Sequence, residues 1–376
     1  MKMAIQIFKP KYRTKEVLKE IKECLDMGWT GLGFKTEQLE EAWKKYTDFE
    51  HAHFVSSNTA GLHISLKIFK DTNKWKDDDE VITTPLTFVS SNHAILYNNL
   101  KPIFADIDEE LCLDVKSIES KITKRTRAIM FVGMGGNIGQ YYEVRKLCNK
   151  YNLNLILDAA HMAGTKVHRT YMGVAQAYTQ AGWDADVAIF SFQSVKNMPT
   201  ADGGMICFQN KDYDILARKL SWLGIDKGTF NRTSSKGSYN WDYDVVDLGF
   251  KAHGNSVMAA LGLVALKYLD HDNERRREIC EMYDTGFKGE SLINIVSHSS
   301  SCISSRHLYQ IRVSNRNEVM EFLNANDIFP GVHYKDNTQY KLYSDAQGTC
   351  PNAHKISNEI ISLPIHMFLT DEEIKK

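Results

Sequence analysis

A lysine and an aspartate lie where two apolar segments end, and together they suit one kind of cofactor chemistry. Asp158 closes the run Leu-Asn-Leu-Ile-Leu-Asp, and Lys196 lies in the Ser/Gly-containing stretch Ser191–Gly204. A lysine amine can form a Schiff base with an aldehyde, and a carboxylate can keep a pyridine nitrogen protonated so that the ring accepts electrons from a carbanion. The pair therefore predicts pyridoxal 5'-phosphate (PLP) as the cofactor and Lys196 as the catalytic residue.

A second candidate feature is the polar turn Ser56-Ser57-Asn58-Thr59-Ala60, which opens an apolar helical segment. The free N–H groups and the dipole of a helix N-terminus favour an anion such as a phosphate. A simple capped helix start explains the same residues, and the sequence leaves both interpretations open.

The elements that must position these residues alternate between strand and helix. Strands are predicted at 52–55, 81–84, 103–107, 128–132, 155–158, 187–190 and 205–208, with helices at 15–27, 36–47, 59–69, 90–96 and 141–151. Such alternation indicates an α/β fold whose large domain has a mostly parallel, mixed sheet between helices. Ligands of these sheets bind beyond the carboxyl ends of the strands, and we expect Ser56–Ala60, Thr87–Phe88, Asp158 and Lys196 to converge there.

The later part of the chain changes character. A helix with Asn255 as its N-cap is expected at 255–269, a second helix at 271–288, short strands at 293–296 and 307–313, and a helix at 318–325. We predict a large cofactor-binding domain at 1–254, including the N-terminal helices, and a small C-terminal α+β domain at 255–376. Residues 165–184 look like a long irregular excursion, and 225–245 like a surface loop that is either a solvated connection or a lip over the substrate.

The bulk composition excludes several classes of protein. The chain has 376 residues, is 43% hydrophobic and 25% charged, and carries a formal net charge of -1, so nothing favours nucleic acid or an anionic membrane surface. Its seven cysteines form no CxxC pair, which supports neither a metal site nor a disulfide framework, and a reduced, cytoplasmic setting fits them best. No apolar run is long enough for a transmembrane helix.

Taken in order, the motifs resemble the DegT/StrS-type sugar aminotransferases, a PLP-dependent family with the aspartate-aminotransferase-like (type I) fold. The resemblance runs from about residue 8 to the end. Its motifs are Ser57-Asn-Thr-Ala-Gly-Leu-His63, Thr84-Pro-Leu-Thr-Phe-Val89, Pro102-Ile-Phe-Ala-Asp-Ile107, Asp158-Ala-Ala-His161, the Lys196 stretch, Leu248-Gly-Phe-Lys-Ala-His253, Gly331-Val-His-Tyr334 and Ile361-Ser-Leu-Pro364.

The resemblance implies roles for individual residues. Lys196 would carry the cofactor and move the proton, Asp158 would hold the pyridinium, and Phe88 would stack on its ring. The remaining implied cofactor contacts are Asn58, Thr59, Ala60 and Ser191, the last three of them at the phosphate, His161 at the phenolic oxygen, and Lys251 at the phosphate from the partner subunit, while His253, His333 and Tyr334 would face the substrate. This arrangement implies a homodimer with active sites at the interface.

The expected activity is transamination of a nucleotide-linked keto-6-deoxy sugar, at C4 or C3, with L-glutamate as the amino donor and the pyridoxamine form of the cofactor between the half-reactions. The product would enter amino sugar biosynthesis, such as that of lipopolysaccharide O-antigen. Dehydratases of the family carry His where this chain has Lys196, which favours transamination. A keto-cyclitol aminotransferase of antibiotic biosynthesis and a non-catalytic PLP-binding regulator remain as alternatives.

Three departures from the family pattern stand out. Residues 131–137, Phe-Val-Gly-Met-Gly-Gly-Asn, replace a more usual stretch beside the cofactor, so the pocket shape there is open. The 165–184 excursion is longer than usual. The sequence also stops at 371–376, where the last helix of the family would begin.

Overall fold

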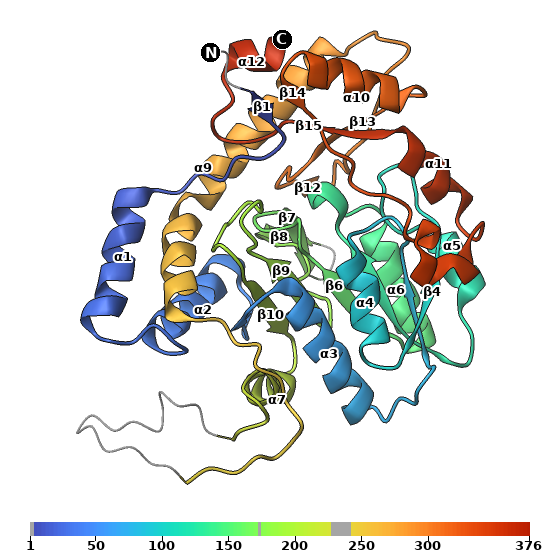
Figure 1. The fold of residues 1–376 in the computed structure, drawn as a ribbon. Helices are drawn as coiled ribbons and strands as arrows, with labels where there is room; N and C mark the ends of the chain where they lie inside the picture. Colours follow the sequence, from blue (N-terminus) through green and yellow to red (C-terminus); the bar gives the residue numbers. More distant parts are fainter. Residues whose placement is uncertain (1–3, 172–173, 227–241) are drawn as a thin grey trace.

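The computed structural model describes residues 4–171, 174–226 and 242–376. Its centre is a seven-stranded sheet flanked by helices, and a smaller body carries the C-terminal segments (Figure 1). The strands of the large sheet, in spatial order, are β2 (His53–Val55), β10 (Gly204–Phe208), β9 (Val187–Ser191), β6 (Asn154–Asp158), β5 (Thr126–Val132), β3 (Glu80–Thr83) and β4 (Lys101–Phe104). Only β10 runs antiparallel to its neighbours, which confirms the predicted mostly parallel, mixed sheet.

Alternate residues of the central strands enter two separate apolar clusters, because successive side chains of a strand point to opposite faces. In β5, Ala128 and Met130 belong to one cluster, while Ile129 and Phe131 belong to the other. Both faces are therefore buried, as a parallel sheet requires. The covering helices are α2 (Phe34–Thr47), α3 (Asn58–Thr72), α4 (Val89–Leu96), α5 (Val115–Lys121), α6 (Tyr141–Tyr151) and α7 (Lys211–Ser221), while α1 (Thr14–Asp26) contributes to neither cluster.

The sheet topology fixes where the candidate residues lie. Strands β6 and β9 pair in parallel, with Asp158 opposite Ile189, so Asp158 and the turn that carries Lys196 leave the sheet at the same edge. The start of β10 and the N-terminus of α3 meet there too. A Cβ on Gly204 would lie 2.6 Å from the backbone nitrogen of Asn58, so only glycine permits this approach.

The smaller body is built around a three-stranded sheet of β11 (Asn294–Ile295), β13 (Tyr309–Arg312) and β15 (Ile360–Leu363). With it lie α10 (Arg316–Ala325), α12 (Asp371–Lys375) and the pair β1 (Ile5–Gln6) and β14 (Ile328–Phe329). Helix α11 (Pro351–Glu359) packs instead through Ala353 and Ile356 on the core of the large sheet. Short 3-10 turns are η1 (Met134–Gly136), η2 (Asn337–Gln339) and η3 (Lys341–Ala346).

One long helix, α9 (Ser256–Gly286), replaces the two helices predicted at 255–269 and 271–288. Asn255 caps it as expected, since its side chain accepts a hydrogen bond from Met258 N. The first half of α9 packs on α1 and α2, and the second half packs on the smaller body (Figure 1). The prediction of two helices was wrong. The sequence becomes polar after Leu269, which suggested a break, but no Gly or Pro follows there to end the helix.

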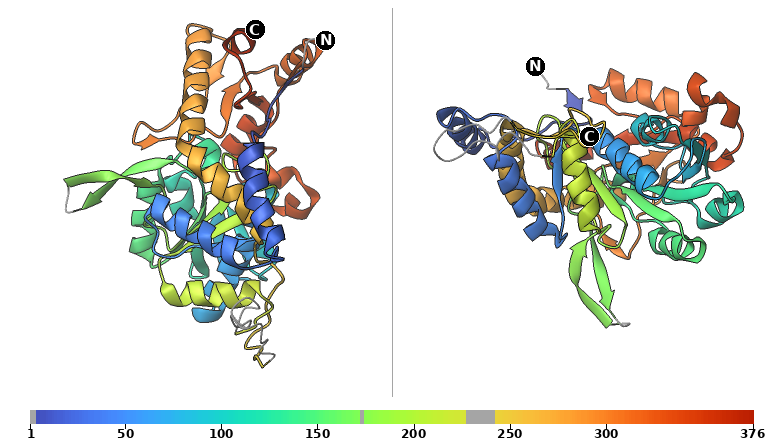
Figure 2. Two further views of the ribbon diagram at one scale, coloured as in Figure 1. Left: turned by 90° about the vertical axis from the view of Figure 1, so that its left-hand side faces the viewer. Right: turned by 90° about the horizontal axis from the view of Figure 1, so that it is seen from below.

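The segment 165–184 is a β-hairpin rather than an irregular excursion. Strands β7 (Lys166–Tyr171) and β8 (Val174–Gln180) pair antiparallel, and β12 (Cys302–Ile303) adds to β7. The hairpin projects from the body of the protein (Figure 2). Its first strand, Lys-Val-His-Arg-Thr-Tyr, has little of the apolar/polar alternation by which a half-buried strand is predicted.

The domain division at residue 254 remains a prediction, and most of the 225–245 loop lies outside the described residues. No helix in the described part of the chain is both long and apolar enough to cross a membrane.

Candidate active site

Asp158 is a buried carboxylate held from three sides at the end of β6. Its Oδ2 accepts a hydrogen bond of 2.7 Å from Ser91 Oγ, and its Oδ1 accepts from Asn58 Nδ2 and Ala160 N, both at 3.2 Å. Burial raises the pKa of Asp158, which these hydrogen bonds and the charge of Lys196 only partly offset. A cationic group facing Asp158 would therefore stabilise the buried negative charge of its carboxylate.

Lys196 follows β9 in a turn closed by the hydrogen bond from its own N to Gln193 O, at 2.8 Å. Its side chain is half-buried. Burial lowers the pKa of the Lys196 amine to about 8, and the charge of Asp158 acts in the opposite direction. The site thus brings the amine closer to its neutral, nucleophilic form at physiological pH.

His161 and Tyr334 form a hydrogen-bonded pair between the two bodies. Gly135 N donates to His161 Nδ1 at 3.1 Å, so the proton of the imidazole is on Nε2 and is donated to Tyr334 Oη at 3.2 Å. Burial lowers the pKa of His161 well below its ordinary value, which keeps the ring neutral, and raises the pKa of Tyr334. The Tyr334 hydroxyl proton is thereby free to be donated into the pocket.

The departure at 131–137 has a structural explanation. Its 3-10 turn, η1, turns the Gly135 amide onto His161, and Gly135 has a φ of 63°, which glycine adopts readily. The stretch therefore sets the imidazole tautomer beside the candidate cofactor site.

Two further histidines lie in the same region. His333, predicted toward the substrate, is hydrogen-bonded through Nδ1 to Ser362 Oγ at 2.9 Å, and burial lowers its pKa to about 4. His307 was not predicted as a site residue. Its ring centroid lies 4.4 Å from that of His161. The ring stacks on that of Phe8, with 5.4 Å between the centroids, and its Nδ1 lies 2.8 Å from Asn197 Oδ1.

The N-terminus of α3 lies at the same edge of the sheet. Ser57 Oγ caps the helix by accepting from Ala60 N at 3.1 Å, so that amide already has one partner. The Asn58 side chain donates to Asp158 Oδ1 and to Ile189 O, so it contacts the candidate pyridinium partner. Thr59 follows at the first turn, and Ser191, buried at the end of β9, lies opposite Gly204.

Phe88 ends the loop before α4 and is 59% exposed, and its ring centroid lies 6.1 Å from that of Tyr334. Asn337 connects this loop to the loop that follows Tyr334. Its N donates to Pro85 O and its Nδ2 to Thr87 O, both at 2.8 Å. An apolar ring left open beside a polar site is suited to stack on a flat heterocycle.

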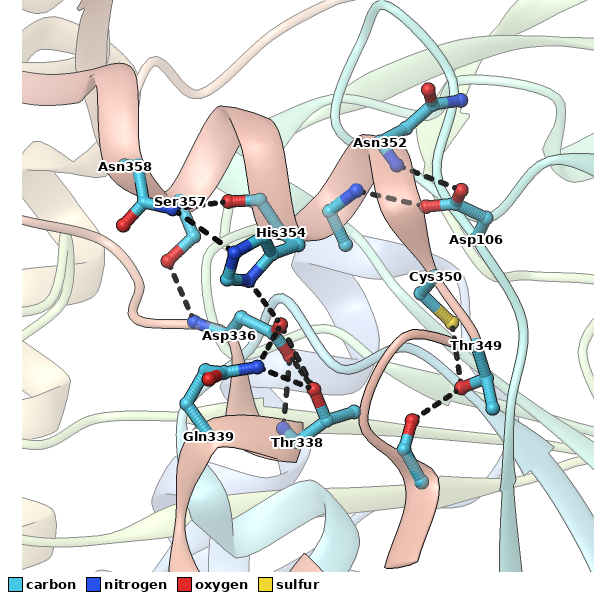
Figure 3. A network of polar contacts seen from close by, with 12 residues as sticks. Asp106, Asp336, Thr338, Gln339, Thr349, Cys350, Asn352, His354, Ser357 and Asn358 are labelled. Atoms are coloured by element: carbon cyan, nitrogen blue, oxygen red, sulfur yellow. Dashed lines mark hydrogen bonds and ion pairs between the residues drawn. The ribbon is translucent and has the colours of Figure 1, made fainter. Parts of the chain in front are cut away.

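The loop that follows Tyr334 is fixed by a buried polar network (Figure 3). The Asp336 carboxylate accepts from Thr338 N at 2.9 Å and lies 3.2 Å from His354 Nδ1, while Asp336 N donates to Ser357 Oγ at 2.8 Å. Asp106 holds the N-terminus of α11, which carries His354 and Ser357. The loops that carry Tyr334 and Phe88 are thus anchored by the hydrogen bonds of Asp336 and Asn337.

Lys251 and His253 lie beside Trp222, in the segment that pairs with the end of β2. The backbone of His253 forms an isolated antiparallel β-bridge with Val55. The Lys251 ammonium lies 3.3 Å from the ring centroid of Trp222, and the ring centroids of His253 and Trp222 are 4.5 Å apart. The two side chains face the same way, as their spacing predicted. Their role in a partner's site remains a proposal.

The sequence analysis missed Ser91 and His307. A signal existed for Ser91, which lies three residues after Phe88, in the first turn of the following helix. His307 gave no local signal, because its neighbours in space, Phe8 and His161, are distant along the chain.

These residues fit PLP. The buried Asp158 carboxylate lacks a full cationic partner, the Lys196 amine has a lowered pKa, the open Phe88 ring offers a stacking face, and the α3 N-terminus offers amides to a phosphate.

Comparison with known proteins agrees with this geometry. Residues 11–376 match the family model of the DegT/DnrJ/EryC1/StrS aminotransferases. The chain belongs to that family and is a PLP-dependent sugar aminotransferase.

Individual relatives match over nearly their whole lengths. The spore coat polysaccharide biosynthesis protein SpsC of Bacillus subtilis is 32% identical over 96% of this chain and 92% of its own. The structure is similar to PseC of Helicobacter pylori, an aminotransferase involved in pseudoaminic acid biosynthesis, with a TM-score of 0.87, 27% identity and coverage of 99% and 96% of the two chains. It is also similar to the pyridoxamine-phosphate form of Spr1654 of Streptococcus pneumoniae, with a TM-score of 0.86, 27% identity and coverage of 98% and 96%.

Proposed function

We propose that this protein transfers the amino group of L-glutamate to a nucleotide-linked keto-6-deoxy sugar, at C4 or C3. The observation that carries the proposal is the Lys196 amine, whose pKa is lowered to about 8, at the same sheet edge as the buried Asp158 carboxylate. PLP, when bound, supplies an electron sink for the carbanion formed in each half-reaction.

The protein's own groups would divide the work. Lys196 takes a proton from the donor's α-carbon and returns one to the former carbonyl carbon of the sugar. Asp158, held by Ser91 and Asn58, keeps the ring nitrogen protonated. Tyr334, which accepts from His161, directs a hydroxyl proton toward the reacting groups.

The names of the relatives support a sugar substrate. SpsC is a spore coat polysaccharide biosynthesis protein and PseC is involved in the biosynthesis of pseudoaminic acid, and we infer that the amino sugar made here enters a surface polysaccharide such as lipopolysaccharide O-antigen. We further propose a cytoplasmic homodimer in which the partner's segment, with Lys251 and His253, completes each site.

Absorbance tests the proposal directly. The protein is expected to be yellow, and L-glutamate should bleach the band as the cofactor takes up the amino group. Nucleotide-linked 4-keto and 3-keto sugars should then restore it. A panel that also contains keto-cyclitols separates the two enzymatic substrates, and a yellow protein that no amino acid bleaches would indicate a regulator.

Borohydride reduction and peptide mapping test the residue assignment. The label is expected on Lys196. Labelling of another lysine, or full transaminase activity in Lys196→Ala, would refute the mechanism.

A further inference from the structure

Asn197, the residue after Lys196, is a buried amide whose side chain bonds to other parts of the fold. It is 7% exposed. Its Nδ2 donates to Asn273 Oδ1 at 2.7 Å and to Ser305 O at 2.8 Å, and its Oδ1 lies 2.8 Å from His307 Nδ1. Because the amide nitrogen donates both of its protons, the amide oxygen is the acceptor and His307 Nδ1 carries the proton.

Asn273 extends this chain of amides to the segment between β6 and β7. It lies on α9 with 1% of its surface exposed, and its Nδ2 donates to Ala163 O at 3.0 Å. A Cβ on Gly164, whose φ is 83°, would lie 2.3 Å from that Nδ2, so glycine suits this close approach. Two side-chain amides therefore join the turn of Lys196 to the turn that follows Asp158.

The loop between β12 and β13 fastens the same site from the side of the smaller body. Ser305 Oγ donates to His161 O at 2.7 Å, and His307 N donates to Gly135 O at 3.0 Å. Both Ser305 and His307 are almost fully buried, so water competes little for these hydrogen bonds. Together with its bonds to Asn197, the loop holds the lysine turn and the turn of His161 in one arrangement.

The Lys196 turn is closed at its base by the backbone hydrogen bond from Ser194 N to Ala201 O, at 3.0 Å. Asn197 adds three bonds next to the lysine itself. We propose that Asn197 is a positioning residue for Lys196, which anchors the lysine to α9 and to the β12–β13 loop so that the amine stands in a fixed place when it moves a proton. This inference rests on the proposed transaminase function and adds to it the residues that hold the catalytic amine.

Removal of the anchor should slow proton transfer more than it weakens donor binding, because misplacing a reacting group by about 1 Å can cost about 100-fold in rate. In Asn197→Ala, the rate constant for bleaching at saturating L-glutamate should fall by about tenfold or more, while the half-saturating concentration changes less than about threefold. A partly unfolded variant would lower the amplitude of bleaching and leave the rate constant unchanged. Asn149→Ala, at an exposed position on α6, is the control. A wild-type rate constant in Asn197→Ala would overturn the proposal.

Two variants of His307 separate its hydrogen bond from the packing of its ring. His307→Asn keeps an amide donor near the position of Nδ1 but loses the ring, and His307→Phe keeps a ring beside Phe8 and His161 but loses the donor. His307→Asn should bleach several-fold faster than His307→Phe at saturating glutamate. Equal rate constants, or the reverse order, would overturn the anchor. If Asn197→Ala does not fold, this pair decides.

Hydrogen exchange in the cofactor-free protein tests the anchor without any turnover. The backbone amides of residues 194–200 should exchange about tenfold faster in Asn197→Ala and in His307→Phe than in the wild type, while those of β5 stay unchanged. If no amino acid bleaches the wild-type protein, the transaminase proposal fails, and the exchange rates alone decide whether the anchor exists. Unchanged exchange at 194–200 in both variants would overturn it.

Discussion

Ser91 Oγ lies 2.7 Å from Asp158 Oδ2, so a hydroxyl from the first turn of α4 holds the carboxylate at the end of β6. The contact lowers the pKa of Asp158 against the effect of burial. It therefore favours the ionised form that a pyridinium partner needs.

We expect Ser91→Ala to weaken PLP binding about tenfold, because a hydrogen bond to a charged group contributes about 1.5 kcal/mol or more. Titration of the cofactor-free protein, followed by absorbance, measures the dissociation constant. Ser90→Ala is the neighbouring control. An unchanged constant in Ser91→Ala would show that this hydroxyl does not matter for the cofactor.

The lowered pKa of Lys196 predicts a pH-dependent stability of the cofactor-free protein. Between about 8 and the ordinary value of 10.5, the unfolded chain binds a proton at Lys196 that the folded protein does not, so this group makes the free energy of unfolding rise with pH. Below pH 8 the buried ammonium lowers stability.

Lys196→Met should accordingly be more stable than wild type at pH 7, by on the order of 1–3 kcal/mol. The difference should shrink as the pH passes from 8 to 10.5. Urea denaturation at several pH values measures it, with Lys211→Met as an exposed control. A difference that does not vary with pH would contradict the assigned shift.

Asn337 is expected to hold the loop of Phe88 to the loop of Tyr334. Asn337→Ala leaves Thr87 O without its 2.8 Å donor in a buried position, which should lower the free energy of unfolding by about 1–3 kcal/mol. Denaturation followed by fluorescence measures the loss. Asn358→Ala, on the exposed face of α11, should change stability little; a similar loss in both variants would argue against the specific role.

Asp106 is expected to stabilise α11 through its N-terminus. Its two carboxylate oxygens accept from Asn352 N at 2.9 Å and Ala353 N at 2.8 Å (Figure 3). Asp106→Ala should cost about 1–2 kcal/mol, as the loss of a helix cap does. Thermal denaturation compares it with Asp345→Ala, and equal melting temperatures would refute the cap.

Local pattern was enough to predict much of the large domain. The strands of the central sheet were visible as short apolar runs, and Asp158 and Lys196 followed two of them. Since parallel strands end at one edge, their convergence could be inferred without a structure. The Asn255 cap was equally local.

The sequence by itself determined the fold class, the family and the lysine–aspartate pair, because these depend on residue type, order and short-range periodicity. Tertiary structure alone decided which groups surround that pair. The hydrogen bond from Ser91 to Asp158, the one between His161 and Tyr334, and the one from Arg276 to Ile365 all join residues far apart in the chain. Their energies depend on burial and distance in three dimensions, which no local pattern contains.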